Sequence, residues 1–379
     1  MIAMPSDREL LEQFRPVLQY DSRELYYADS ARSFLENFFA GGPAAPYGNV
    51  LRGKDGNVIA SAGVDPAGPN SLRLDFLRPD GDEYSTGERV SSDDFLDAST
   101  KAYVADARRH HDEDGIGNVI YGAVLPGAEG KRWLQYWFFF YYNDKSVRGF
   151  GVHEGDWEGI QIRVGPPDAE GKVTPDEVTY SQHTGGERAD WGDVELDDET
   201  GAPVVYVGLG SHASYLRSGQ HSAPIVPDVC DAGGARVRPA LELLDEQTHP
   251  WVRWPGRWGA SKKRGLISFP SPESPGKQRR WDEPDAYHAD ADRFDERRAV
   301  AEEGPVAPVV KARRDGDTVH VDMTAPPGTA AKLVVPAVVD GVPHALEYDL
   351  SELPDGQDVT LTPAGDVTPA APNADDDRL

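Results

Sequence analysis

The chain has 379 residues and a strong excess of acidic side chains. It carries 65 Asp and Glu against 38 Lys and Arg, which gives a formal net charge of −27 at pH 7. Affinity for nucleic acid depends on Lys and Arg that displace counterions from phosphates, so this charge excludes nucleic acid as an expected partner. The length predicts two or three domains, and a hydrophobic content of 39% is enough for a buried core.

Three features of the sequence bear on the compartment. The single cysteine, Cys230, cannot form an internal disulfide, so folding does not require an oxidising environment. Residues 1–5 lack the basic start of a signal peptide, and no apolar run of sufficient length follows them. An uninterrupted run of 18 apolar residues is absent, which argues against a transmembrane helix. We therefore expect a cytoplasmic protein, bacterial by its composition, with non-classical export left open.

The first third of the chain predicts short helices among strands and loops. Ser6 and Glu9 have the spacing of a helix capping box, so a helix is expected as far as Phe14, followed by a strand over residues 17–20. Further predictions are a helix around 31–39, hairpins and loop over 41–70, and a helix that begins at 91–94 and ends at 110–111.

From residue 118 the pattern changes to strands joined by Gly and Pro turns. Residues 133–142 are apolar or aromatic on both alternating faces, which predicts a central strand covered on both sides. No helix long enough for a parallel crossover lies between the strands. We therefore predict an antiparallel β-sandwich with a few short helices over residues 1–300. The expected strands are 119–124, paired with 133–142 as a hairpin, and 159–164, 178–183 and 204–209.

Three segments complete the chain. Residues 251–281 are rich in Trp, Gly and Pro; a stacking platform for a sugar or a quaternary amine is conceivable, but packing over the core is the predicted role. Residues 304–366 contain about six short alternating strands, which predict a small immunoglobulin- or fibronectin-like module able to dock a partner protein. Residues 367–379 are expected to be a disordered acidic tail.

One segment carries the strongest functional signal. In residues 153–164, Ile160 and Ile162 alternate with polar residues, and the same alternation places Asp156 and Glu158 on the inward face. Two buried carboxylates two residues apart repel each other and lose hydration, so they need a shared proton, a basic side chain or a cation.

A divalent metal is one way to compensate these acids. His153 lies just upstream and Asp144 follows the neighbouring aromatic strand, so the predicted metal ligands are Asp144, His153, Asp156 and Glu158. The dominance of oxygen ligands favours Mg, Ca or Mn over Zn. Spacing alone leaves a second interpretation open, an internal salt-bridge network in which Arg148, Arg163 or backbone amides satisfy the acids.

A second candidate lies where the predicted strand 204–209 ends in Gly-Ser-His. His212 would lie at the strand mouth, as a general acid or base, a wall of the site or a structural histidine. Ser211 is not favoured as a nucleophile, because the surrounding residues do not form a Gly-x-Ser-x-Gly elbow. Weaker candidates are His183, His221 and the pair His110 and His111, for which a solvated helix end is favoured over a metal site.

The chain resembles the vacuolar protein sorting-associated protein sixty-two family over most of residues 14–288. Several separate motifs occur in the same order, which makes the resemblance specific, although the trafficking name implies little biochemistry. The motifs are Arg-Pro-Val-Leu-Gln-Tyr at 15–20, Leu-Gln-Tyr-Trp-Phe-Phe at 134–139, His-Glu-Gly-Asp-Trp-Glu at 153–158, Gly-Ser-His-Ala-Ser-Tyr at 210–215 and Gly-Arg-Trp-Gly at 256–259.

A more distant similarity is to the necrosis- and ethylene-inducing protein-like toxins, whose heptapeptide Gly-His-Arg-His-Asp-Trp-Glu shares the frame His-x-x-Asp-Trp-Glu. Those proteins are single-domain β-sandwiches with a divalent cation near one end, used in engaging sphingolipid headgroups. The resemblance implies metal ligation by Asp144, His153, Asp156 and Glu158. It departs at Gly155, where the toxins have a second His, and it does not imply toxin activity.

These observations lead to one main functional hypothesis and two alternatives. The main hypothesis is a lectin-like, metal-containing β-sandwich that binds a polar ligand, a glycan or a lipid headgroup, at the end bearing the acids and His212. The first alternative is a metal-dependent hydrolase in which Glu158 and His212 are catalytic. The second is a non-catalytic interaction protein in which buried arginines take the place of the metal.

Overall fold

The computed structural model divides the chain into two compact units, Met1–Glu302 and Glu303–Leu379, which are described separately. For residues 263–264 and 267–268, and for all residues from 309 onward, only the backbone is described. The described residues are 5–35, 49–61, 76–79, 81–98, 100, 102–112, 116–145, 152–183, 185–221, 227–260, 263–264, 267–268, 270–294, 309–315, 318–324, 332–339, 342–349, 359–361 and 367–369.

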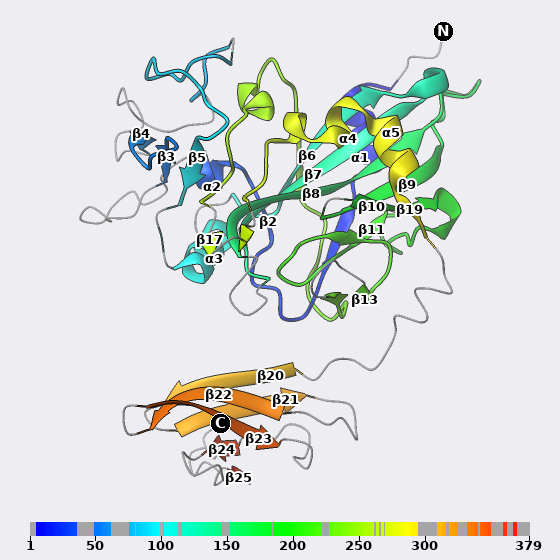
Figure 1. The fold of residues 1–379 in the computed structure, drawn as a ribbon. Coiled ribbons are helices and arrows are strands. Elements are labelled where there is room, and N and C mark those ends of the chain that lie inside the picture. Colours follow the sequence, from blue (N-terminus) through cyan, green and yellow to red (C-terminus); the bar gives the residue numbers. More distant parts are fainter. Residues whose placement is uncertain are drawn as a thin grey trace. The chain divides into compact units, whose positions relative to one another are not determined.

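Short helices surround the strands of the first unit (Figure 1). None of the helices in the described ranges is long and apolar enough to cross a membrane. The α-helices are α1 (Asp7–Gln13), α2 (Arg32–Leu35), α3 (Tyr103–Asp112), α4 (Arg279–Asp282) and α5 (Pro284–Asp290), and the 3-10 helices are η1 (Ala128–Gly130), η2 (Trp191–Asp193), η3 (Pro250–Arg253) and η4 (Pro275–Lys277).

Two sheets dominate the first unit. The large sheet has the order β16 (Ala240–Leu243), β6 (Val119–Pro126), β7 (Arg132–Asn143), β8 (His153–Val164), β9 (Pro175–Gln182), β10 (Gly185–Asp190) and β19 (Asp292–Arg293), and β2 (Ala28–Asp29) also pairs with β7. The small sheet has the order β12 (Ser214–Tyr215), β11 (Val204–Val207), β1 (Val17–Tyr20) and β15 (Arg236–Val237). Smaller sheets join β3 (Val50–Arg52), β4 (Val58–Ser61) and β5 (Phe95–Asp97), β13 (Gly219–His221) and β14 (Asp228–Cys230), and β17 (Lys263–Arg264) and β18 (Ile267–Ser268).

The predicted mainly β fold is confirmed, but its sheets are mixed. Strands β6 to β10 pair antiparallel in chain order, including the predicted hairpin of β6 and β7. Three pairs, β1 with β11, β16 with β6 and β10 with β19, are parallel. These parallel partners lie far apart in the sequence, so a rule based on short connections does not detect them.

Strand β7 explains how the core is divided. Phe138 and Phe140 point to one face of the large sheet and pack in a cluster that contains Leu18 of β1 and Val205 of β11. The small sheet therefore covers this face, and the two sheets form a sandwich. Phe139 points to the opposite face, so the predicted central strand covered on both sides is confirmed.

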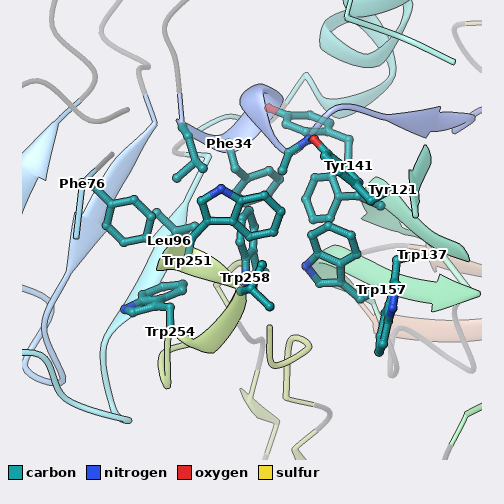
Figure 2. Packing of buried hydrophobic residues seen from close by; sticks show 14 of the residues in the cluster. Phe34, Phe76, Leu96, Tyr121, Trp137, Tyr141, Trp157, Trp251, Trp254 and Trp258 are labelled. Atoms are coloured by element: carbon teal, nitrogen blue, oxygen red, sulfur yellow. The ribbon is translucent and has the colours of Figure 1, made fainter. Parts of the chain in front are cut away.

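The Trp-rich segment covers that opposite face. Figure 2 shows Trp251 and Trp258 beside Trp157 of β8, and Trp254 packs on Trp258; all four residues are at most 3% exposed. The ring centroids of Trp157 and Trp258 lie 5.4 Å apart in an edge-to-face arrangement, as do those of Phe139 and Trp258 at 5.3 Å. The prediction that these tryptophans pack over the core is confirmed.

The predicted helical elements are partly right. The capping box of α1 is present, because the Ser6 side chain accepts from the backbone of Glu9 and the Glu9 carboxylate accepts from the backbone of Ser6. The helix expected from residues 91–94 begins only at Tyr103. Residues Phe95–Asp97 instead form β5, which pairs with β3, so a tertiary strand partner overrides the local pattern.

The described residues of the second unit form six strands. A four-stranded sheet has the order β20 (Val309–Asp315), β21 (Thr318–Thr324), β24 (Val359–Leu361) and β25 (Val367–Pro369), and β22 (Lys332–Val339) pairs with β23 (Val342–Asp349). The immunoglobulin- or fibronectin-like arrangement of residues 304–366 stays a prediction. The tail was expected from residue 367, but β25 includes residues 367–369, and 370–379 lie outside the described residues.

Strand β8 requires a glycine at position 155. Its φ of +63° lies in the left-handed region, and a Cβ at this position would collide with the carbonyl oxygen of Trp258. The backbone of the Trp-rich segment thus approaches β8 where only glycine fits.

We expect Gly155→Ala to destabilise the first unit far more than Gly201→Ala. Gly201 also has a positive φ of +67°, but no atom lies near its added Cβ, so its substitution should cost about 1–2 kcal/mol for the backbone alone. The collision at Gly155 should add roughly 1–3 kcal/mol. Urea unfolding followed by tryptophan fluorescence measures both, because all eight tryptophans belong to the first unit. Equal losses would contradict the close approach.

Candidate functional site

Two strands and two loops bring a group of acids to one end of the sandwich. Asp156 lies on β8, and Asp144 directly follows the last residue of β7. Glu24 belongs to the loop after β1, and His212 to the loop between β11 and β12. We call these four residues, Glu24, Asp144, Asp156 and His212, the acid–histidine centre.

His212 is the cation of this centre. Its side chain is fully buried, and Nδ1 donates to Oδ2 of Asp156 at 3.1 Å, while Nε2 lies 3.8 Å from Oε1 of Glu24. Burial alone would lower the pKa of His212, but the hydrogen bond to Asp156 and the pairing with Glu24 outweigh it and raise the pKa to about 10. The ring also stacks on Phe140, with centroids 4.0 Å apart.

The two acids that face His212 are held by further hydrogen bonds. Glu24 accepts from the backbone N–H groups of Leu25, Tyr26 and Gly210 at 2.8–2.9 Å. Asp156 accepts from Asn143 Nδ2 at 2.9 Å, and this bond and the one from His212 both reach Oδ2. Burial raises the pKa of both carboxyls, but the partners outweigh it, so both pKa values lie below the ordinary value.

Asp144 is the accessible acid of the centre. It is half-buried and has no ion-pair partner among the described residues. Burial and the negative charge of Glu24 raise the pKa of Asp144, and the charge of His212 opposes them. A carboxylate in this setting is a natural acceptor for an external cation.

The side chain of Glu158 is buried, as predicted, but its hydrogen-bond partner is Ser181 and not His212. Ser181 Oγ donates to its Oε2 at 2.5 Å, and the side chain is buried. Burial and the charge of Asp156 raise the pKa of Glu158 to about 8, although Arg280, Ser181 and His183 oppose the shift. The group is therefore predominantly protonated at neutral pH, which is how the repulsion between the two acids is relieved.

His153 and Glu154 have separate roles. His153 is half-buried, and its Nδ1 donates to the carbonyl of Gly155 at 2.8 Å, which leaves Nε2 as the nitrogen able to accept or to ligate. Glu154 accepts from the backbone of Ala98 and Ala260 and from the hydroxyl of Tyr103 at 2.6 Å. Glu154 therefore stabilises the fold on the other face and is not part of the centre.

The predicted metal ligands do not form a ready-made ligand set. Across the ranges that the structure describes, no group of three or more His, Cys, Asp and Glu side chains is arranged to hold a metal ion. Asp156 is engaged by His212 and Asn143, and Glu158 by Ser181. A divalent cation would fit here only as Mg²⁺ often binds, through one or two carboxylates and several waters.

The arginine alternative takes a form that the sequence did not suggest. Arg163 is wrong as the partner, because it pairs with Asp176 and Glu177 at the opposite end of β8. Arg148 lies outside the described residues. The buried cation near Glu158 is Arg280 of α4, whose guanidinium donates to the carbonyl of Trp157 and stacks over the ring of Trp137 at 3.8 Å.

A second centre, which sequence reasoning missed, lies around Asp228 of β14. Its carboxylate is fully buried and accepts hydrogen bonds from Tyr215 at 2.5 Å and His183 at 2.6 Å, and also from Ser211 and Lys145. These five residues are called the Asp228 centre below. The hydroxyl of Ser211 therefore donates to Asp228. No local pattern marks Asp228, because its four partners come from three separate segments, 13 to 83 residues away in the sequence.

The remaining candidates are structural. His110 and His111 both contact Asp29, at 3.1 and 2.7 Å, so they link α3 to β2 and do not form a solvated helix end. His221 stacks on Tyr215 with centroids 3.8 Å apart. Burial raises the pKa of the Cys230 thiol to about 12, as suits a small apolar residue.

Comparison with protein families confirms the resemblance to the vacuolar sorting family. The family model described as vacuolar protein sorting-associated protein 62 matches residues 141–223, a stretch that holds most of both centres. The putative vacuolar protein sorting-associated protein TDA6 of Saccharomyces cerevisiae is 24% identical over 297 residues, which cover 64% of this chain. The matched region spans 58% of the length of that relative.

Solved structures of necrosis- and ethylene-inducing protein-like proteins show a weaker similarity. Non-toxic HaNLP3 is 13% identical, with 64% of this chain and 76% of that chain covered and a TM-score of 0.30. NLPPya in complex with mannosamine is 12% identical; the match covers 64% of this chain and 79% of that chain, with a TM-score of 0.29. Necrosis and Ethylene inducing Protein 2 from the causal agent of cocoa's Witches Broom disease is 15% identical, with 64% and 77% covered and a TM-score of 0.29. TM-scores this low support no conclusion about a ligand.

The Asp228 centre predicts a specific pH dependence of stability. The hydrogen bond to Asp228 raises the pKa of His183 above the ordinary 6.5, so this pair stabilises the fold fully below about pH 6.5 and loses its effect as pH rises through the folded pKa. The free energy of unfolding of the native protein should therefore fall relative to that of His183→Gln as pH rises. Tryptophan fluorescence in urea measures it.

His249→Gln is the control, since His249 is a half-buried histidine without a contact to Asp228. It should follow the native pH profile. An unchanged difference between the native protein and His183→Gln across this pH range would show that Asp228 does not hold the imidazolium.

Proposed function

We propose that this protein binds a polar ligand, a glycan or a lipid headgroup, at the end of the sandwich that bears the acid–histidine centre, and that a divalent cation contributes to this binding. The observation that carries the proposal is the charge of the centre. Three carboxylates, from Glu24, Asp144 and Asp156, surround one imidazolium, His212, which leaves two negative charges without a counterion among the described residues.

The donor chemistry supports a hard cation. Asp144 is half-buried and unpaired among the described residues, and the described hydrogen bonds of Asp156 leave its Oδ1 available. Carboxylate oxygens with completing waters suit Mg²⁺, Ca²⁺ or Mn²⁺, whereas Zn²⁺ prefers nitrogen and sulfur. His153 could add its Nε2 from the rim. A bound dication would offset the excess charge and offer open positions to hydroxyl or phosphate oxygens.

The hydrolase alternative has less support. A metal-dependent hydrolase needs a base near the cation, whereas Glu158 is buried and accepts a hydrogen bond from Ser181, and burial and the charge of Asp156 raise its pKa. His212 is held as an imidazolium between two acids and is fully buried, so it is also unsuited to accept a proton. Binding without turnover is therefore the function that the geometry favours.

We further propose that the second unit, Glu303–Leu379, acts as a spacer or as a docking module for a partner protein, in the cytoplasm. Its separation as a compact unit, with strands that pair only with one another, supports this role. Deletion of this unit should leave cation binding by the first unit unchanged.

Substitution of Asp144 tests the cation directly. Isothermal titration of chelator-treated protein with Mg²⁺, Ca²⁺ and Mn²⁺ in turn should detect one ion for each chain, and Asp144→Asn should weaken the binding at least tenfold, about 1.4 kcal/mol. Asp156→Asn should do the same. Because Asp144 is half-buried and supports no described ion pair, its variant should keep the native stability.

Asp176→Asn is the matched control, because Asp176 is a partly exposed carboxylate that pairs with Lys131 and Arg163 away from the centre. It should bind the ion like the native protein. If the native protein takes up none of the three ions, or Asp144→Asn binds equally well, the cation is not part of this site.

A further inference from the structure

The Asp228 centre combines a fully buried anion with two cations that reach the surface. The carboxylate of Asp228 is 0% exposed, whereas the side chains of Lys145 and His183 keep 16% and 31% of their surface exposed. The carboxyl is strongly ionised, because the hydrogen bond and charge of His183 and the charge of Lys145 lower its pKa despite burial. Asp228 therefore holds two cationic side chains, Lys145 and His183, next to each other, and both are partly exposed to solvent.

His183 is oriented for an external partner. Its Nε2 is engaged by Asp228, and Nδ1 on the other side of the ring has no hydrogen-bond partner among the described residues. The residue adopts a φ of +49°, an uncommon backbone conformation for a side chain other than glycine, in the turn between β9 and β10. Strain of this kind is concentrated at sites where the position of a side chain matters for function.

The Asp228 centre adjoins the acid–histidine centre through consecutive residues. Asp144 belongs to one centre and Lys145 to the other, and the same is true of His212 and Ser211. With Lys145 and His183 protonated, the Asp228 centre has one net positive charge, opposite in sign to its neighbour. The two centres therefore place residues of opposite charge next to each other in the sequence, and Asp144 and Lys145 are both half-buried.

We propose that Lys145 and His183 form an anion subsite that binds a phosphate group of the polar ligand, next to the cation-binding centre. This inference rests on the proposed function only for the position of the rest of the ligand. The ammonium of Lys145 acts as a point charge and the Nδ1–H of His183 as a directed donor, a pair of contacts that suits the several oxygens of a phosphate. Ser211 and Tyr215 act indirectly, by fixing Asp228.

The charge of the whole protein makes this subsite easy to test. At a net charge of −27, the molecule repels anions in general, so phosphate binding would report a local site. Inorganic phosphate is the first probe, titrated calorimetrically into the full chain in the presence of a chelator. Omission of divalent cations separates this test from the one for the acid–histidine centre.

The native protein should bind one phosphate, and Lys145→Gln and His183→Gln should each weaken binding about tenfold or more, as expected for the loss of a charged hydrogen bond. Lys145→Arg, which keeps the charge, should retain most of the affinity. Lys131→Gln is the matched control, since Lys131 is a similarly exposed lysine paired with Asp176 away from both centres. It should bind phosphate like the native protein.

Vesicles distinguish a lipid headgroup from a soluble phosphate ester. Co-sedimentation with phosphatidylcholine vesicles containing phosphatidic acid, which is lost in His183→Gln, would assign the subsite to a lipid phosphate. Binding of inorganic phosphate without vesicle binding would assign it to a soluble ester. The proposal is overturned if the native protein binds neither probe, or if folded Lys145→Gln and His183→Gln both bind as the native protein does.

Discussion

The ion pair between Asp156 and His212 is the interaction on which the end of the sandwich depends. Asp156 belongs to the large sheet and His212 to the loop that continues the small sheet, so their hydrogen bond of 3.1 Å links the two layers. Neither group is stable at this depth alone, because a buried charge without a partner costs several kcal/mol. Phe140 covers the imidazole ring and excludes water from the pair. The imidazole also faces Glu24, whose Oε1 lies 3.8 Å from Nε2 of His212.

Charge is organised at two scales in this protein. Most of the acidic excess is spread along the sequence, whereas the two centres place opposite charges next to each other through consecutive residues. Under the proposed function, the arrangement suits a small ligand that carries a phosphate group beside a part able to bind a cation held by the acid–histidine centre. The tryptophans, which a carbohydrate site could have used, are instead buried against the other face of the large sheet.

Much of the fold follows from the alternation of residues along single strands. The burial of Asp156 and Glu158 and the two-sided burial of β7 could be predicted, because strand parity is a local property. The parallel pairing of β1 with β11 and the strand at Phe95–Asp97 could not, since both depend on partners far along the chain. The sequence also could not reveal that His212 is the cation that pairs with Asp156, or that Arg280 lies near Glu158.

The residues that were missed share one physical cause. Glu24, Arg280 and Asp228 each act through contacts with segments more than a hundred residues away or with several segments at once, so no short motif contains their partners. Gly155 is instructive in another way. It lies inside a recognisable motif, but glycine is needed there because the backbone carbonyl of Trp258, from a distant segment, lies against it.

A double-mutant cycle between Asp156 and His212 tests the central claim most directly. The free energies of unfolding of the native protein, Asp156→Asn, His212→Asn and the double variant would be compared by tryptophan fluorescence in urea. Asn suits position 212, because it tolerates the left-handed φ of +57°. The account predicts a coupling energy of about 1–3 kcal/mol. Additive effects, within about 0.5 kcal/mol, would show that the two side chains do not stabilise each other and would contradict it.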